Sequence, residues 1–275
     1  MINENAATCG HQVTVYNRTK SKAEDWLNIY KGRVAETPAE VAKVSDFIFC
    51  CVGNDEDLKS VSIGDIGAFK QMVRGSIFID HSTVSAKVSQ ELASIASENG
   101  FGFIDAPVSG GQVGAEKGAL TVMCGGEKDL FNKIKSLIAC YSKSCMLMGK
   151  SGTGQLTKMV NQICIAGILQ GLSEGLLFSE KAGLDSSLVL DVISKGAAGS
   201  WQMKNRGTTM AKNEFEFGFA VDWMRKDLGI CLDEANTIDA SLPITALLDQ
   251  YYKDVQRMGG GRWDTSSLIA RLRKM

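Results

Sequence analysis

The chain has 275 residues, of which 44% are apolar, and its thirty basic and thirty-one acidic residues leave a formal net charge of −1. This length provides one large domain or two ordinary ones, with ample material for a buried core. The balanced charge gives no reason to expect nucleic acid as a partner, so any binding of anions must be local.

Membrane and metal-binding classes are not indicated either. No segment approaches the roughly 20 apolar residues that a membrane helix needs, and the first residues show neither the basic cluster nor the apolar core of a secretory signal. Eight cysteines occur without the CxxC or Cys/His spacing of a zinc site. We therefore expect no metal, no membrane, and a reduced, cytoplasmic setting.

In chain order, the first half alternates short β-rich runs with amphipathic helical stretches. Strands are predicted at residues 13–17, 46–52, 76–82, 102–108, 119–126 and 145–149. Helices are predicted at residues 20–32, 57–72, 85–100 and 127–141. This alternation, with nearly all-apolar strands, predicts an α/β domain built on a parallel sheet with helices on both faces.

From residue 155 onward the sequence is helical almost to its end. One long helix is predicted over residues 155–181, apolar on most faces, with Gly183 as its C-terminal cap. Because the pattern changes within the glycine-rich stretch 149–154, we divide the chain into an α/β domain at residues 1–152 and an all-helical domain at 153–275.

The strand at 13–17 ends in Asn17 and Arg18. In a doubly wound nucleotide-binding sheet, an acidic side chain at the end of the second strand bonds the adenosine ribose and disfavours a 2′-phosphate. Asparagine and arginine in that place favour NADP over NAD. On the dipeptide alone, an exposed turn arginine is the better interpretation.

Three further loops follow predicted strands. Gly53 and Asn54 end one strand at the expected carboxyl edge of the sheet, where ligands bind in open α/β folds. After the next strand, Ser82 or Thr83 is expected to cap the following helix. The third loop contains Ser109 and two glycines, whose backbone N–H groups could hold a small carboxylate or form a purely structural turn.

On the long helix, Lys158, Asn161 and Gln162 are spaced i, i+3 and i+4 and project from one face. Their neighbours are apolar, so the lysine is expected to be partly desolvated, which lowers its pKa and suits it to acid/base work. A solvated side chain is the alternative. Lys226 and Asp227 read as charges facing water, and Trp201 as a core aromatic residue.

Taken in order, seven segments resemble the β-hydroxyacid dehydrogenases, the family of 3-hydroxyisobutyrate dehydrogenase and tartronate semialdehyde reductase. They are "HQVTVYNRTKSKAE", "FCCVGNDEDL", "IDHSTVS", "DAPVSGGQVGAEKGALTVMCGG", "GTGQLTKMVNQ", "SEKAGLD" and "RKDLG". The resemblance implies a Rossmann-type NAD(P)-binding domain at residues 1–152 and a helical substrate and dimerisation domain at 153–275. It further implies a homodimer or homotetramer that oxidises or reduces a small β-hydroxy acid or its semialdehyde.

The resemblance also implies roles for individual residues. Lys158 matches the family's catalytic lysine, the general acid/base. The residues that match substrate contacts are Ser109, Gly110, Gly111, Asn161 and Gln162. The residues that match cofactor contacts, to NADP by preference or to NAD, are Asn17, Arg18, Thr19, Val52, Gly53, Thr83 and Lys226. Glutamine at 162 replaces the second asparagine of many members, so the identity of the carboxylate substrate stays open.

The sequence departs from the family at its start, where members have a strand and a "GLGxMG" turn that approaches the pyrophosphate. Aligned with the family, "NENAATCGH" forms the last turns of the first helix, capped by Gly10. The first strand lies mid-sheet in this fold, so we expect the strands at 13–17 and 76–80 to face a gap. A chain of this sequence is expected to bind dinucleotide poorly.

Two other functions fit parts of the pattern. A non-catalytic family member would use the helical domain for dimerisation or binding, but such relatives lose the catalytic lysine that Lys158 matches. A phosphosugar dehydrogenase of the wider 6-phosphogluconate dehydrogenase superfamily would need more basic residues, for which Lys204 and Arg206 are the only hint.

Overall fold

The structure is a computed structural model that describes residues 9–274. The chain divides into two compact units, residues 1–158 and 159–275, and the division falls inside one long helix. The predicted first helix lies outside the described residues. Gly10, its expected cap, has a φ of +87°, a backbone conformation that favours glycine.

The first unit alternates strands and helices, as the sequence predicts. Its strands are β1 (Thr14–Val15), β2 (Arg33–Val34), β3 (Phe47–Cys50), β4 (Ile77–Asp80), β5 (Gly102–Asp105), β6 (Val108–Ser109), β7 (Leu120–Gly125) and β8 (Ser142–Gly149). Its helices are α2 (Lys20–Leu27), α3 (Pro38–Lys43), α4 (Asp55–Ser62), the 3₁₀ turn η1 (Ala68–Lys70), α5 (Ala86–Glu98), α6 (Gly111–Glu116) and α7 (Lys128–Ile138).

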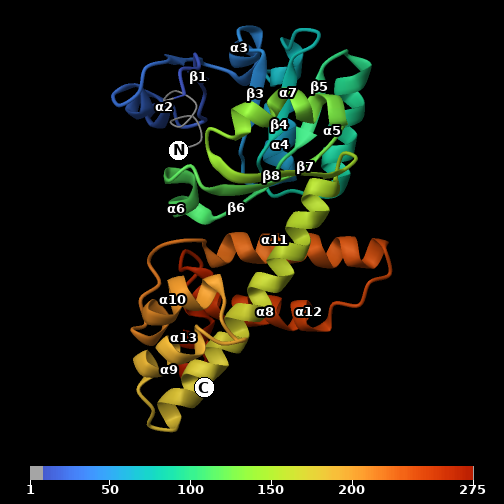
Figure 1. Cartoon of the computed structure of the whole chain (residues 1–275). Helices are drawn as coiled ribbons and strands as arrows, with labels where there is room; N and C mark the ends of the chain where they lie inside the picture. Colours follow the sequence, from blue (N-terminus) through green and yellow to red (C-terminus); the bar gives the residue numbers. More distant parts are fainter. Residues whose placement is uncertain (1–8, 275) are drawn as a thin grey trace. The chain divides into compact units, whose positions relative to one another are not determined.

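The main sheet of this unit has six strands in the order β3-β4-β5-β7-β6, with β8 paired to β7 (Figure 1). All four residues of β4 and of β5 are buried, which explains why these runs are almost wholly apolar. One core cluster includes Phe78, Leu92 and Phe103, and a second includes Ile79, Ile104 and Ile134. These two clusters fix the strand ends that carry the candidate site.

The sheet is mixed, so the expectation of a wholly parallel sheet is wrong at β7. Strands β3, β4 and β5 run parallel, whereas β7 is antiparallel to both β5 and β6, and β8 is parallel to β7. The reversal follows from β6 and α6, two short elements that the sequence pattern did not predict. They return the chain beside β5 without a long crossover.

Strands β1 and β2 form a separate two-stranded parallel sheet. Within residues 9–274, β3 has a single strand partner, β4, whereas β4 pairs on both sides. Strand β3 is therefore an edge of the main sheet, and the expectation that residues 76–80 would face a gap is wrong. The sequence pattern does not reveal the two-residue strand β2. The strand at 76–80 is therefore one position later in the order of strands than expected.

The helix predicted over residues 57–72 is two elements, α4 and η1, separated by a turn. Glycine interrupts it: a Cβ on Gly64 would lie 2.4 Å from the Ser60 carbonyl oxygen, and one on Gly67 would lie 2.4 Å from the Ser62 carbonyl oxygen. These backbone approaches require glycine, and they end the helical run earlier than its apolar periodicity predicts.

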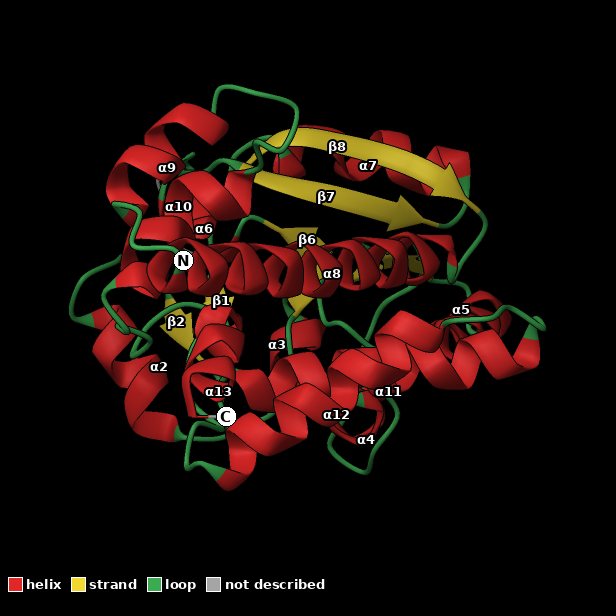
Figure 2. Ribbon diagram, turned by 90° about the horizontal axis from the view of Figure 1, so that it is seen from below, coloured by secondary structure: helices red, strands yellow, loops and turns green. Residues whose placement is uncertain are grey.

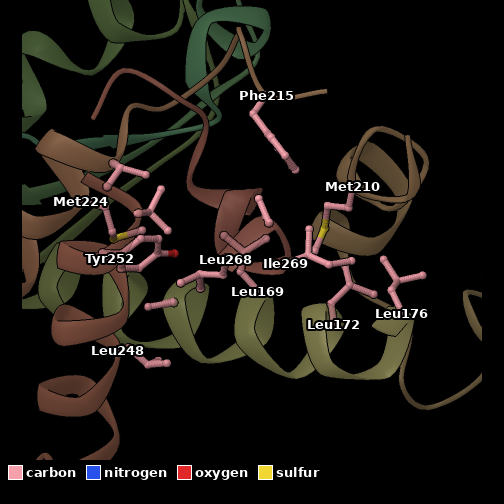
Figure 3. Close-up of a cluster of buried hydrophobic side chains, with 14 of the residues drawn as sticks. Leu169, Leu172, Leu176, Met210, Phe215, Met224, Leu248, Tyr252, Leu268 and Ile269 are labelled. Carbon is pink, nitrogen blue, oxygen red and sulfur yellow. The ribbon is translucent and has the colours of Figure 1, made fainter. Parts of the chain in front are cut away.

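The second unit is helical, as predicted. It contains most of α8 (Thr153–Lys181), followed by α9 (Ser186–Ile193), α10 (Trp201–Ala211), α11 (Val221–Thr237), α12 (Pro243–Arg257), the 3₁₀ turn η2 (Thr265–Ser267) and α13 (Leu268–Lys274). Figure 3 shows Leu169, Leu172 and Leu176 of α8 among the buried side chains of this unit. Tyr252 and Leu268 pack in the same cluster.

Helix α8 has the length and composition of a membrane-spanning helix, with a mean hydropathy of 1.2 in its most apolar window. The expectation that no segment has this character is therefore wrong for α8. Its leucines nevertheless pack in a protein core, and 44% of that window is buried. Gly183 ends the helix as predicted: its φ is +72°, its N–H donates to the Glu180 carbonyl, and the Leu184 N–H donates to the Ser179 carbonyl.

Candidate active site

Polar groups gather where β3 and β4 end in the first unit. The Ser82 hydroxyl accepts a hydrogen bond from the backbone N–H of Val52, 2.8 Å away, and the Ser82 N–H donates to Asp80 Oδ1 at 2.9 Å. These bonds join the loop after β3, which contains Val52 and Gly53, to the loop after β4, which contains Thr83. Two of the predicted cofactor segments therefore lie side by side.

Gln155, in the first turns of α8, fixes the loop after β4. Its Oε1 accepts from the Val84 N–H at 3.2 Å, and its Nε2 donates to the Ser82 carbonyl at 2.8 Å. The side chain is fully buried. The expectation that Ser82 or Thr83 caps the next helix is wrong, because Ser85 does so by accepting from the Val88 N–H.

Asp105, the last residue of β5, holds the start of α8. Its Oδ1 accepts from the Gly152 N–H at 2.7 Å and its Oδ2 from the Gln155 N–H at 3.1 Å. A Cβ on Gly125 or Gly154 would come within 2.7 Å of this carboxylate, so glycine permits the close packing. Burial raises the pKa of Asp105 to about 6, although these backbone donors favour its charged form.

His81 and Asp80 are buried beside this edge. His81 Nδ1 lies 2.6 Å from the Ala106 carbonyl oxygen and Nε2 lies 2.8 Å from the Tyr141 hydroxyl. Since a carbonyl can only accept, Nδ1 carries the proton and Nε2 accepts from the tyrosine. Burial lowers the pKa of His81 to about 4 and raises the pKa of Asp80 to about 7. The histidine is therefore neutral at physiological pH.

The Ser109 segment is a short strand followed by a short helix. Gly110 and Gly111 have φ values of +134° and +63°, which L side chains rarely adopt. A Cβ on Gly111 would meet no atom within 4 Å, so its backbone faces open space. The paired glycines thus leave room for a small group to approach the main chain beside Ser109, as the sequence interpretation requires.

Lys158 lies in the last turn of α8 that belongs to the first unit, and it is 7% exposed. The prediction that this lysine is withdrawn from solvent is therefore confirmed. It sits one turn after Gln155, on the helix whose start is held by Asp105. The hydrogen bonds of Asp105 and Gln155 fix the position and the rotation of the start of α8, which carries Lys158.

A chain of polar groups lies in the second unit. Asn161 Nδ2 donates to Gln162 Oε1 at 2.8 Å, and Gln162 Nε2 donates to Asp227 Oδ2 at 2.5 Å. Lys226 Nζ lies 2.8 Å from Asp227 Oδ1. Asp227 is 1% exposed, so the expectation that it faces water is wrong. It brings the predicted residues Asn161, Gln162 and Lys226 into one network.

The segment Asn17–Thr19 follows β1. Asn17 Oδ1 accepts from the Thr19 N–H at 2.9 Å, which forms a tight polar turn. The Arg18 side chain is 86% exposed and lies 3.3 Å from Asp57 of α4. An exposed pair of this kind is weak, so the guanidinium is free to turn toward an anionic ligand.

Arg206 lends little support to a phosphosugar site. Its Nε lies 3.2 Å from Asp264, whose side chain is 2% exposed. Its guanidinium also stacks over Trp201 and Phe217, with 5.2 Å and 5.0 Å to the ring centroids. Trp201 is half-exposed at the start of α10, so the expectation of a core aromatic residue is wrong there.

Comparison with known proteins identifies the family of the chain. Residues 1–149 match the NAD binding domain of 6-phosphogluconate dehydrogenase, and residues 152–272 match the domain described as NAD-binding of NADP-dependent 3-hydroxyisobutyrate dehydrogenase. The chain belongs to the β-hydroxyacid dehydrogenase family. It is an NAD(P)-dependent oxidoreductase of a small 3-hydroxy acid or its semialdehyde.

Individual relatives align with nearly the whole length of this chain. An uncharacterized oxidoreductase of Shewanella frigidimarina is 56% identical over 96% of this chain and 91% of its own length. The 2-hydroxy-3-oxopropionate reductase of Escherichia coli is 34% identical over 98% of this chain and 92% of its own. The crystal structure of 3-hydroxyisobutyrate dehydrogenase from Salmonella typhimurium superposes with a TM-score of 0.87 at 25% identity, covering 98% and 94% of the two chains.

Sequence reasoning missed Asp105 and Gln155 at the sheet edge of the first unit and Asp227 in the polar network of the second unit. Asp105 and Gln155 are fifty residues apart in the chain, and Asp227 is sixty-five residues from Gln162. A weak signal was available for Asp105, because a carboxylate placed between an apolar strand and a proline is seldom buried without a partner.

Proposed function

We propose that Lys158 is the general acid/base of a hydroxyacid oxidoreductase whose substrate carries a carboxylate. The observation that carries this proposal is the buried lysine on a helix whose start is tied to the sheet edge by Asp105 and Gln155. A proton donor must be held in place to serve the reaction, and these bonds hold the helix rather than the side chain alone.

The candidate residues have different roles in the proposed reaction. The nicotinamide cofactor, when bound, supplies or accepts the hydride. Lys158 Nζ gives a proton to the substrate oxygen during reduction and takes it back during oxidation. The backbone of Ser109, Gly110 and Gly111 receives the carboxylate, for which the open space beside Gly111 leaves room. Asn161 and Gln162 orient the substrate, and Asp227 fixes the amide of Gln162.

The proposal is tested by Lys158→Ala and Lys158→Arg. Both variants should fold, by circular dichroism and thermal melting, while turnover of each accepted substrate falls by about 10²-fold or more. Glyoxylate, succinic semialdehyde, tartronate semialdehyde and hydroxyisobutyrate, each with both cofactors, form the substrate panel. Lys181→Ala, at the other end of α8, is the control and should keep full activity. Turnover retained in Lys158→Ala would remove the lysine from this role.

For the cofactor we propose NADP rather than NAD. The turn after β1 offers the exposed Arg18 and no acidic side chain, which suits a 2′-phosphate. Val52, Gly53 and Thr83 lie at the neighbouring strand ends, Thr19 belongs to the same turn as Arg18, and Lys226 is proposed as a further contact from the second unit. The description of the second matched domain, which names an NADP-dependent dehydrogenase, supports the same preference.

Calorimetric binding of NADPH and NADH tests this preference without a turnover assay. Loss of one charge-assisted contact in Arg18→Ala should weaken NADPH binding about 10-fold and leave NADH binding unchanged. Lys22→Ala removes a nearby exposed cation of α2 and serves as the matched control. Equal loss of affinity for the two dinucleotides would contradict a role for Arg18 at the 2′-phosphate.

We propose further that the protein forms a homodimer or homotetramer through its helical unit. Phe178 is 73% exposed on α8, and Leu188 and Val192 are 70% and 67% exposed on α9. Large apolar side chains so exposed are typical of a surface that another chain covers. Phe178→Glu should lower the mass measured by light scattering, and an unchanged mass in Phe178→Glu and Leu188→Glu would reject this surface.

The thiols support a proposal about location. None of the eight cysteines, which all lie within residues 9–274, forms a disulfide. A reducing compartment such as the cytoplasm suits that state. Imaging of a fluorescent fusion tests this proposal, and export of the fusion would overturn it.

A further inference from the structure

Two thiols meet on neighbouring strands of the first unit. Cys124 is on β7 and Cys145 is on β8, and their sulfur atoms are 3.6 Å apart. The strands run parallel, with Cys145 opposite Val122 and Cys124 opposite Leu147. Figures 1 and 2 show the strands side by side. Since alternate residues share a face of a strand, both thiols lie on the same face of the sheet.

The two thiols differ in access to solvent. Cys124 is fully buried, whereas Cys145 is partly exposed. Cys145 is therefore the more accessible residue of the pair, and the Cys124 sulfur lies 3.6 Å from the Cys145 sulfur. An accessible thiol beside a protected one is the arrangement found in proteins that form reversible disulfides.

We propose that Cys124 and Cys145 form a redox modification site that a hydroperoxide converts to a disulfide. The Cys145 thiolate attacks the terminal oxygen of the peroxide, which breaks the O–O bond, oxidises the sulfur to sulfenic acid and, with one proton, releases water or an alcohol. The Cys124 sulfur then attacks the sulfenic sulfur. The S–O bond breaks, the S–S bond forms, and the hydroxyl leaves as water with the Cys124 proton.

The electrostatics of the pair suit these two roles. The contact with Cys124 lowers the pKa of Cys145 despite the opposing effect of burial, and the positive charge of Lys135 lowers it further. The same contact and burial hold the pKa of Cys124 well above its ordinary value. Elsewhere in residues 9–274, burial raises the pKa of Cys50 and of Cys140. Attack thus begins at Cys145 and is completed by Cys124.

Bond formation must shorten the sulfur separation from 3.6 Å to about 2.05 Å. Gly125 follows Cys124 and packs against the Asp105 carboxylate, which holds the start of α8. The bond therefore acts on the strand that supports the helix carrying Lys158. On the proposed function, oxidation should lower turnover in proportion to the disulfide formed, and dithiothreitol should restore it.

Trypsin separates the relevant cysteines, because cleavage after lysine places Cys124 in peptide 118–128, Cys140 in peptide 136–143 and Cys145 in peptide 144–150. The whole folded protein is treated with hydrogen peroxide, denatured, alkylated and digested. Mass spectrometry should then find peptides 118–128 and 144–150 joined, two hydrogen masses lighter than their sum. Dithiothreitol should release both.

Cys145→Ser should abolish the linked peptide, and Cys140→Ser, which removes a neighbouring thiol, should retain it. If the wild-type protein yields both peptides separately, with alkylated thiols or with Cys145 as sulfinic acid, the proposal is wrong. The wild-type map decides the question even where a variant fails to fold. It also decides it independently of turnover, so a failure of the proposed function leaves the disulfide test intact.

Discussion

The carboxylate of Asp105 accepts a hydrogen bond from the backbone N–H of Gly152, with 2.7 Å between the oxygen and the nitrogen. This bond joins the end of a central strand to the turn that begins α8. A negative charge at this end of a helix is favourable, because the first N–H groups have no partner within the helix. The bond therefore holds the start of α8, the helix that carries Lys158, against the end of β5.

Asp105→Asn should weaken that junction. Asparagine keeps one acceptor oxygen but turns an N–H₂ group toward a backbone N–H, so a buried donor loses its partner. We expect the free energy of unfolding to fall by about 1–3 kcal/mol and turnover to fall with it, as measured by urea denaturation and initial rates. Asp129→Asn, on the exposed side of α7, is the matched control. Equal stability of the two variants would show that the bonds to α8 contribute little.

Alanine substitutions at two glycines of α8 should change the stability of the protein in opposite directions. A Cβ at Gly154 would lie 2.4 Å from the Met123 carbonyl oxygen and 2.7 Å from Asp105 Oδ2, whereas a Cβ at Gly171 would meet nothing within 4 Å. Gly154→Ala should therefore destabilise the protein by about 1–3 kcal/mol. Gly171→Ala should stabilise it by about 0.4–1 kcal/mol, because alanine restricts the unfolded chain. Thermal melting of the two variants checks both signs, and a stable Gly154→Ala would contradict the packing.

The buried Asp80 makes stability depend on pH. Burial raises its pKa from 3.8 to about 7, so between these values the folded chain holds a proton that the unfolded chain has released. Stability should therefore fall as pH rises through this window. His81, with its pKa lowered to about 4, acts in the opposite direction below its ordinary value of 6.5.

Asp80→Asn isolates the contribution of this carboxyl, since His81 and Asp105 are present in both proteins. The fall in unfolding free energy between about pH 5 and about pH 8 should be smaller in the variant than in the wild-type protein. Urea denaturation at the two pH values measures it. Parallel changes in the two proteins would mean that Asp80 does not titrate in this range.

Gln162→Glu tests the buried contact with Asp227. The substitution replaces the donating amide by a second carboxylate facing Asp227 Oδ2, which now lies 2.5 Å from the amide nitrogen. Repulsion should destabilise the variant at neutral pH and disappear as acid protonates one of the pair. The stability difference from wild type should therefore shrink on acidification. Gln162→Met, which cannot titrate, is the control, and its deficit should change less with pH.

The sequence predicted the features that depend on local pattern. The spacing of Lys158, Asn161 and Gln162 on one helix, and the left-handed glycine after α8, follow from residues close together in the chain. Asp105 and Asp227 act through partners that are at least 47 residues away in the chain, which no local periodicity reveals. The short strand β2 has too few residues to show alternation. Apolar periodicity does not reveal the close approach of Gly64 and Gly67 to the Ser60 and Ser62 carbonyls, which divides the helix predicted at 57–72.

The small sheet of β1 and β2 has a consequence for how the molecule opens. Its register contains two residue pairs, Thr14 with Arg33 and Val15 with Val34, and β2 is not buried. Two-stranded sheets of this size are marginal in water, so these amides should exchange with deuterium sooner than those of β4 and β5. This segment also carries Arg18. With the NADP site proposed at Arg18, dinucleotide binding should therefore protect the amides of this small sheet from exchange.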